Sequence, residues 1–261
     1  MMLNTESSDN IKYDGFKKLL GDFKEDLACF LFPPFCYICN NPLKDGRSAI
    51  CNDCRKNVFL TIRSSSPLCP VCQSFYPDIF DNCRHCSGRR SPGKLYCLTG
   101  FDSNMRELIH AFKYAGRIEI GAELADKAYD IYGNFEFILN ADLIIPVPLY
   151  YRKELDRGYN QAGILAERLS LKTSKPFDKT NLKRVKNTKS QTHLNTQQRY
   201  TNVRGAFKVK NPSAVKGKRI VLVDDVVTTG ATLYECSRSL KKAGASKVVS
   251  LTIARPVIQG E

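Results

Sequence analysis

The 261-residue chain lacks any long run of apolar residues. Its most apolar early stretch, Leu27 to Phe35, contains Pro33 and Pro34, whereas a membrane-spanning helix needs about 20 apolar residues. We therefore expect no transmembrane segment. The first ten residues, MMLNTESSDN, also lack the basic and then apolar pattern of a secretory signal, so we expect a cytoplasmic protein.

Acidic residues are scarce. The chain has 26 Asp and Glu against 40 Lys and Arg, which gives a net charge of +14. The shortage is greatest over residues 183–210, which hold eight Lys or Arg and no acidic residue. This excess favours an anionic partner such as nucleic acid, a phosphate or a membrane surface. The hydrophobic fraction of 43% excludes a disordered chain and indicates a globular one.

The region 33–94 has little periodic pattern but is rich in cysteine. Eight of the eleven cysteines fall in CxxC pairs, namely Cys36 and Cys39, Cys51 and Cys54, Cys69 and Cys72, and Cys83 and Cys86. Without an export signal, this pattern favours metal binding over disulfides. Because two CxxC pairs complete a tetrahedral four-sulfur site, we expect about two structural zinc ions. Successive or alternating pairs would fit equally well. His85 as a ligand and redox chemistry at the CxxC pairs are weaker alternatives.

From about residue 96, strand and helix patterns alternate. We expect helices over 105–112, 121–132, 161–171 and 231–243, and strands over 142–149, 219–223 and 247–254. Continuous apolar strands between helices indicate an α/β fold with a mainly parallel sheet. We therefore divide the chain into an amino-terminal tail with an amphipathic helix (1–32), a cysteine-rich, zinc-ribbon-like region (33–94) and an α/β domain (95–261).

The string RIVLVDDVVTTGATL, residues 219–233, carries the strongest functional pattern. Asp224 and Asp225 follow an apolar strand, and ligands of parallel α/β sheets bind at the carboxyl ends of strands. The small residues that follow leave backbone N–H groups open at a helix start, where a phosphate can bind. The carboxylates suit sugar hydroxyls or a Mg²⁺ carried by the ligand. A helix-capping role would explain only one aspartate. Together the residues indicate a phosphorylated ribose.

This string resembles the phosphoribosyl-pyrophosphate (PRPP) signature of type I phosphoribosyltransferases, which implies a Rossmann-like domain of that type. The resemblance implies that Asp224 and Asp225 contact the ribose hydroxyls, that the threonine loop holds the 5-phosphate, and that Mg²⁺ accompanies PRPP. The implied PRPP-binding residues are Asp224, Asp225, Val226, Val227, Thr228, Thr229, Gly230, Ala231 and Thr232. For the pyrophosphate-binding loop, the candidates are Pro148, Leu149, Arg152 and Arg157.

The wider order of motifs resembles the ComF/ComFC and GntX family over about residues 25–255. It consists of the CxxC pairs, IPVPL (145–149), RGYNQA (157–162), QTHLNTQQRYTNVRGAF (191–207) and the PRPP signature. The resemblance implies a role in natural transformation, with single-stranded DNA handled on the cytoplasmic side of the membrane. The implied partners are PRPP, single-stranded DNA and DNA-uptake machinery at the inner face of the membrane.

The basic segment 183–210 is expected to form a mobile loop over the ligand. Its candidate contacts to pyrophosphate or nucleic acid are Arg184, Lys186, Lys189, Arg199 and Arg204. Solvated surface cations are the plain alternative for each of them. Tyr200 and Phe207 offer aromatic faces on which bases can stack.

Three functions fit these residues. The first is a ComF-type PRPP-binding protein that serves DNA uptake. The second is an active phosphoribosyltransferase that joins phosphoribose to a nucleobase or an amine. The third is a zinc-ribbon nucleic-acid-binding module whose ribose-phosphate site is vestigial. The intact Asp224–Asp225 pair favours a working binding site. No segment resembles the hood with which transferases recognise a base, unless the cysteine-rich region serves as one.

Overall fold

The computed structural model describes residues 35–43, 48–60, 62, 68–69, 93–188 and 195–256. The chain divides into two compact units, Met1–Lys56 and Asn57–Glu261. The expected helix within residues 1–32 and four of the predicted site residues, Cys72, Cys83, Cys86 and Lys189, lie outside the described residues.

The first unit has little regular structure where it is described. Phe35 and Pro42 form an isolated antiparallel bridge, and α2 (Asn52–Leu60) begins in this unit. Cys36 and Ala49 are fully buried. Leu43 and Ile50 are the other buried apolar residues of the described part of this unit.

The second unit is built on a four-stranded parallel sheet with the order β1-β6-β5-β2. These strands are β1 (Leu95–Gly100), β6 (Lys247–Arg255), β5 (Arg219–Val226) and β2 (Leu143–Pro146). Phe177 adds a single parallel bridge on the outer side of β2. All four residues of β2 are buried, as in parallel sheets that are covered on both faces. The expectation of a mainly parallel α/β sheet is confirmed.

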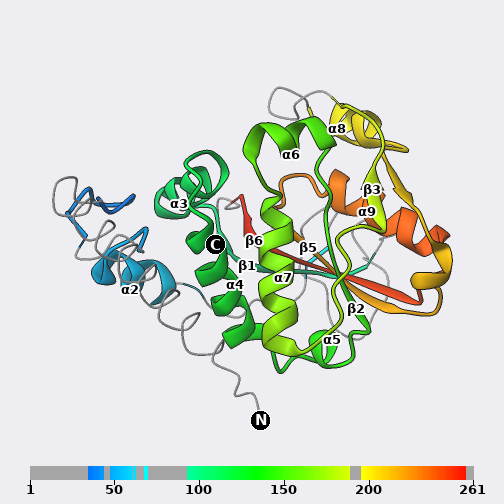
Figure 1. The fold of residues 1–261 in the computed structure, drawn as a ribbon, viewed down its shortest axis with the longest axis horizontal. Helices are drawn as coiled ribbons and strands as arrows, with labels where there is room; N and C mark the ends of the chain where they lie inside the picture. Colours follow the sequence, from blue (N-terminus) through cyan, green and yellow to red (C-terminus); the bar gives the residue numbers. More distant parts are fainter. Residues whose placement is uncertain are drawn as a thin grey trace, which may run out of the picture. The chain divides into compact units, whose positions relative to one another are not determined.

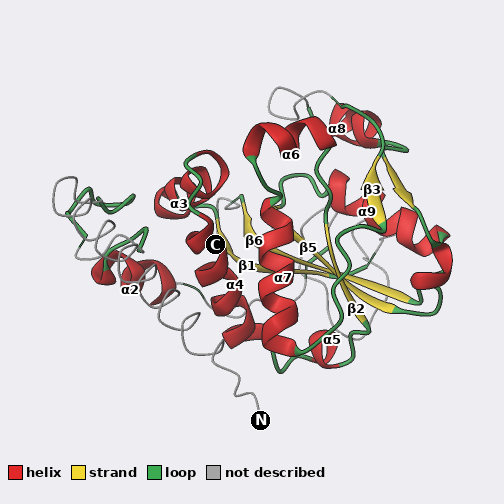
Figure 2. Ribbon diagram, viewed as in Figure 1, coloured by secondary structure: helices red, strands yellow, loops and turns green. Residues whose placement is uncertain are grey.

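Helices cover the sheet on both faces. α3 (Ser103–Tyr114) leads into α4 (Ile118–Tyr132), and α4 packs beside α7 (Gln161–Thr173) across one face, as Figure 1 shows. α9 (Ala231–Lys242) packs against β5 and β6. Because crossovers between parallel strands are right-handed, the β5–α9–β6 unit places α9 on the face opposite to α7. The short helices α5 (Glu136–Leu139) and α6 (Tyr151–Arg157) complete this part (Figure 2).

The segment 183–210 is not a loop throughout. β3 (Leu182–Arg184) and β4 (Phe207–Val209) form an antiparallel pair, with α8 (Thr196–Val203) between them in sequence. The single-turn helix η1 (Pro212–Ala214) follows. Leu182, Val203 and Phe207 are buried in the apolar core that also contains residues of α9. Apolar side chains at both ends of the basic segment thus anchor what the charge pattern alone presented as a loop.

Most predicted elements are present, with shifted ends. The helices predicted over 105–112, 161–171 and 231–243 correspond to α3, α7 and α9, and α4 begins three residues before the predicted 121. β5 continues to Val226, so Asp224 and Asp225 lie within the strand rather than after it. Among the described residues, no helix has both the length and the apolar character needed to cross a membrane.

Candidate functional site

The two aspartates lie in the last three residues of β5, at the carboxyl edge of the sheet. Successive side chains of a strand point to opposite faces. Asp224 therefore shares its face with Leu222 and α9, and Asp225 faces the side of α3 and α7. Each carboxylate also accepts a hydrogen bond from the next backbone N–H: Asp225 N to Asp224 Oδ1 at 2.9 Å and Val226 N to Asp225 Oδ1 at 2.6 Å.

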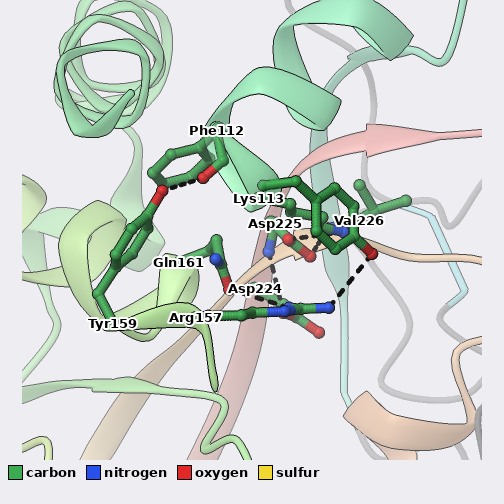
Figure 3. Close-up of polar contacts among 9 residues, drawn as sticks. Phe112, Lys113, Arg157, Tyr159, Gln161, Asp224, Asp225 and Val226 are labelled. Atoms are coloured by element: carbon green, nitrogen blue, oxygen red, sulfur yellow. Dashed lines mark hydrogen bonds and ion pairs between the residues drawn. The ribbon is translucent and has the colours of Figure 1, made fainter. Parts of the chain in front are cut away.

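Asp225 is paired with a cation that the sequence pattern did not single out. Lys113 reaches from the last turn of α3, and its Nζ lies 2.8 Å from Asp225 Oδ2 (Figure 3). Both side chains are largely shielded from solvent, with 21% of Lys113 and 12% of Asp225 exposed. The ammonium neutralises one of the two carboxylates, which lowers the repulsion that an incoming phosphate would meet.

Asp224 lies in a different environment. Burial and the adjacent charge of Asp225 raise the pKa of Asp224 to about 8, against the opposing effects of the Asp225 N–H and the charges of Lys113 and Arg184. Two neighbouring carboxylates in a shielded site resist simultaneous ionisation. A cation or a set of hydrogen-bond donors arriving with a ligand would favour the ionised form.

The loop after β5 ends in an open helix start. Gly230 adopts a left-handed conformation, with φ of 73°, and as the N-cap residue of α9 it offers no capping side chain. Thr229 Oγ1 is buried without a hydrogen-bond partner, while its carbonyl accepts a 2.8 Å hydrogen bond from Tyr200 OH. Thr228 is exposed. The start of a helix and an unsatisfied hydroxyl are features that suit a phosphate.

The predicted PRPP string spans the end of β5, the loop after it and the start of α9. Val226 ends β5, and the N–H of Val227 donates to Ala254 O at 3.0 Å, which extends the pairing with β6 by one residue. Ala231 is the first residue of α9, and Thr232 is the second. The string thus runs from the edge of the sheet to the first turn of the helix.

The loop after β2 lies next to β5. Val147 N–H donates to Val223 O at 2.8 Å, and Asn160 Nδ2 donates to Val147 O at 3.1 Å. Pro148 is buried, and Leu149 is half-buried. Asn160 of the RGYNQA motif thus anchors the start of the candidate pyrophosphate loop through a hydrogen bond to its backbone. The sequence analysis did not assign this role to Asn160.

The two arginines predicted for this loop differ in placement. Arg157 Nη1 donates to Gln161 Oε1 at 3.1 Å, and its guanidinium lies 5.3 Å from the ring of Tyr114, the neighbour of Lys113. Figure 3 shows Arg157 in the same group as Asp224 and Asp225. Arg152 is exposed and donates to Tyr151 OH at 3.0 Å. Arg157 fits the predicted role better than Arg152.

A third cation, Lys153, joins this group and was also missed. Burial lowers the pKa of Lys153, and the positive charges of Arg184 and Arg157 lower it further. Arg184, from β3, is electrostatically coupled to Asp224 as well, and its Nε is buried without a hydrogen-bond partner. Like charges that depress a lysine's pKa indicate a place suited to a multiply charged anion. No sequence signal marks Lys153, because it is one of three charged residues in a row on α6.

The other cations of the basic segment lie around α8. Lys186 Nζ donates to the backbone carbonyl of Arg204 at 3.0 Å. Arg199 lies within α8, and Arg204 is its exposed C-terminal cap. Of the predicted basic residues that the structure describes, Arg184 is the one with a direct electrostatic link to the aspartates.

The first two CxxC pairs form a second candidate site. The sulfur atoms of Cys36, Cys39, Cys51 and Cys54 all lie within 4.8 Å of one another, so the four thiols can hold one metal ion. Cys39 Sγ and Cys51 Sγ are 3.7 Å apart, close to the edge of about 3.8 Å that zinc–sulfur bonds of about 2.3 Å give in a tetrahedron. This ion would thus be shared by successive pairs. Cys69, from the third pair, is described and buried, but its partners are not described.

Backbone donors support thiolates in this cluster. The N–H of Cys51 donates to Cys36 Sγ and that of Cys54 to Cys51 Sγ, both at 3.4 Å. Burial alone would raise the pKa of Cys36, but N–H donors from Cys39, Cys51 and Ile38 lower it to about 6. Burial and neighbouring sulfurs instead raise the pKa of Cys54 far above its usual range. Four thiols so close together cannot all ionise unless a cation binds them.

Comparisons with known proteins agree with this geometry. The family described as "Phosphoribosyl transferase domain" matches residues 118–259. Competence protein F of Haemophilus influenzae is 31% identical over 226 residues, which cover 84% of this chain and 96% of that protein. Competence protein ComFC of Bacillus subtilis is 30% identical over 244 residues, 89% of this chain and 91% of that one. DNA utilization protein YhgH of Escherichia coli is 30% identical over 226 residues, 83% of this chain and 94% of that one.

Solved structures include an adenine phosphoribosyltransferase from Thermoanaerobacter pseudethanolicus, 12% identical, with a TM-score of 0.34 over 77% of this chain and 99% of that one. The parallel sheet flanked by helices, together with the matched domain, defines a protein with a type I phosphoribosyltransferase-like fold. Within that class, the chain belongs to the ComF/ComFC family of competence proteins.

Proposed function

We propose that this protein binds PRPP together with Mg²⁺ at the carboxyl edge of the sheet. The ribose hydroxyls and the Mg²⁺ would be held by Asp224 and Asp225, and the 5-phosphate by the loop from Thr228 to Thr232. The observation that carries the proposal is the buried, unpartnered hydroxyl of Thr229 beside the start of α9. A phosphate oxygen at this position would accept a hydrogen bond from the Thr229 hydroxyl.

The charges around the aspartates support the same ligand. Lys153, Arg157 and Arg184 form a cationic group from two elements that follow the candidate pyrophosphate loop, and Arg184 links this group electrostatically to Asp224. A ligand with a phosphate at one end, a diol in the middle and a pyrophosphate at the other matches this sequence of donors and charges.

Calorimetric titration with PRPP tests the proposal. The unsubstituted protein should bind PRPP in the presence of Mg²⁺, and the double variant Asp224→Asn with Asp225→Asn should lose that binding. Asp130→Asn, a substitution of an exposed aspartate on α4, is the matched control and should bind as tightly as the parent. Equal affinity in the double variant and the parent would refute the assignment of the ribose end.

The names of the relatives support a proposal about the cellular role. Because the named relatives include competence proteins and a DNA utilization protein, we propose that PRPP binding serves the handling of imported single-stranded DNA on the cytoplasmic side of the membrane, with DNA-uptake machinery as partner. A strain that lacks the gene should recover transformation with the parent gene and not with the aspartate double variant. Full recovery by that variant would separate PRPP binding from DNA uptake.

Transferase turnover is the second candidate function. The cationic group formed by Lys153, Arg157 and Arg184 would stabilise departing pyrophosphate while a nitrogen nucleophile attacks the anomeric carbon. Mg²⁺ carried by PRPP would neutralise further charge on the leaving group. An assay of pyrophosphate release over a panel of nucleobases and amines tests this function, with Lys153→Met expected to slow any release that the parent shows. Absence of release with every acceptor would leave binding alone.

We further propose two structural zinc ions. Cys36, Cys39, Cys51 and Cys54 would hold the first, and the remaining pairs, Cys69 with Cys72 and Cys83 with Cys86, would hold the second. Metal analysis of the purified protein should find about two zinc ions per chain. One ion per chain would refute the second site and leave the first.

A further inference from the structure

A pocket lies between α8 and α9, beside the loop from Thr228 to Thr232. Its volume is about 340 Å³, and its walls include Tyr200, Arg204, Tyr234, Glu235 and Arg238. All of these residues belong to the second unit. None of these five is a predicted contact of the ribose, and two of them, Tyr200 and Arg204, belong to the basic segment.

Two tyrosines form the aromatic wall of this pocket. The rings of Tyr200 and Tyr234 meet edge to face, with centroids 5.9 Å apart and an interplanar angle of 75°. Both side chains are half-buried, and both rings line the pocket. An edge-to-face pair fixes each ring while leaving a ring face available for stacking, and a planar base stacks on such a face.

A buried carboxylate fixes an arginine at the rim. Arg238 donates to Glu235 from both Nε and Nη2, at 2.9 and 2.6 Å, and the Gly205 N–H also donates to Glu235 at 2.6 Å. Glu235 is 3% exposed, while about half of the Arg238 side chain, 48%, is exposed. The carboxylate thus holds the guanidinium in one orientation, and the fork retains Nη1 for another acceptor.

The rim carries a net positive charge. Lys186, bonded to the Arg204 carbonyl, and Arg204 itself add two exposed cations to Arg238, against the single charge of Glu235. Oriented guanidinium groups beside an aromatic wall fit a phosphate attached to a planar base. An apolar ligand would gain nothing from these cations, and a simple anion would make no use of the two rings.

We propose that the pocket between α8 and α9 binds a nucleotide unit, with its base stacked on Tyr234 and its phosphate on Arg204 and Arg238. The unit can come from a free nucleotide or from one link of a single-stranded chain. This proposal rests on the proposed function in one respect: the handling of single-stranded DNA would supply such a ligand. Tyr200, which also bonds Thr229 in the phosphate loop, places this ligand next to the PRPP site, and Ala231 lines the pocket as well.

Binding titrations with the full-length protein test the proposal. The probes are a labelled fifteen-nucleotide oligothymidylate, the same chain without bases, and thymidine monophosphate. Tyr234→Leu should weaken oligothymidylate binding about tenfold, because base–aromatic stacking contributes about 1–3 kcal/mol per base, and it should not change binding of the baseless chain. Arg204→Gln should lower the salt dependence by about one phosphate contact. Tyr129→Leu, at a half-buried tyrosine of α4, is the matched control and should bind as the parent does.

The outcomes separate the sources and the hypotheses. Monophosphate binding that Tyr234→Leu weakens identifies a free nucleotide as ligand; a loss confined to the oligonucleotide identifies a chain. The proposal is overturned if the parent binds neither probe, or if both variants bind them as the parent does. PRPP affinity should be the same in Tyr234→Leu as in the parent. If the parent itself fails to bind PRPP but binds the oligonucleotide through Tyr234, the proposed function is contradicted and the nucleotide pocket is retained.

Discussion

The cysteine cluster and the carboxyl edge of the sheet are organised by different forces. The cluster brings Cys36, Cys39, Cys51 and Cys54 together with few buried apolar side chains in the described part of its unit. The edge of the sheet rests on an apolar core in which Leu222 and Leu240 are fully buried. A site of the first kind depends on its ion for structure, whereas a site of the second kind is formed before its ligand arrives.

Removal of the metal ion should have the largest effect, and this effect should be confined to the cysteine cluster. Cys51→Ser, or a chelator, should release the first ion and unfold residues 36–54, because structural zinc contributes roughly 10–16 kcal/mol in small zinc sites. Zinc content and limited proteolysis measure the effect. Cys97→Ala is the matched control, because Cys97 is a buried cysteine of the second unit that bonds backbone carbonyls. The zinc content of this variant should equal that of the parent. A cluster that stays protease-resistant without metal would contradict the account.

A substitution in the apolar core should destabilise the second unit and leave the cysteine cluster unchanged. Leu222→Ala should lower the free energy of unfolding of the second unit by about 2–5 kcal/mol, since it leaves a cavity beneath the aspartates. Urea unfolding followed by circular dichroism measures this loss. Zinc content should be unaffected, and a joint loss of zinc would show that the two regions are not independent.

The buried carboxyl gives a smaller, pH-dependent effect. Because the pKa of Asp224 is raised to about 8 in the folded protein, its stabilising contribution is present at pH values below its ordinary pKa and is lost as the pH rises towards 8. Without Mg²⁺ or ligand, Asp224→Asn should therefore be more stable than the parent at pH 8.5, by about 1–3 kcal/mol, and not at pH 4. Thermal melts at both pH values measure this. Parallel pH profiles for parent and variant would contradict the raised pKa.

The smallest expected effect concerns Lys113. Lys113→Met removes the ammonium beside Asp225, so PRPP affinity should fall about fivefold at low Mg²⁺, which corresponds to about 1 kcal/mol for a partly shielded ion pair. The difference should narrow as Mg²⁺ is raised, because the ion replaces the missing charge. Lys113→Arg should restore the affinity at low Mg²⁺. An equal loss at every Mg²⁺ concentration would indicate a structural role instead.

Local sequence predicted the parts of the site that lie on one continuous segment. The β5–loop–α9 string is contiguous, so its apolar run, paired aspartates and glycine were sufficient to place it. Lys113 and Lys153 come from α3 and α6, and they reach Asp225 and Arg184 only through the order of strands. Sheet order is set by long-range pairing, which no local pattern contains.

The basic segment illustrates the same limit. Its charges predicted a loop, but Leu182 and Phe207 pair β3 with β4 and pack into the core. Short strands of three residues carry too little periodicity to be recognised. The pairing of CxxC motifs was also undetermined by spacing, since successive and alternating pairs satisfy the same tetrahedral geometry.

Hydrogen–deuterium exchange with and without PRPP and Mg²⁺ tests the central claim most directly. If the loop after β5 binds the 5-phosphate, the backbone amides of residues 227–232 should exchange more slowly with ligand, because N–H groups at the start of α9 then donate to phosphate oxygens. The amides of residues 36–54 should exchange at the same rate with and without ligand. Unchanged exchange over 227–232 at saturating PRPP would contradict the assignment of this loop.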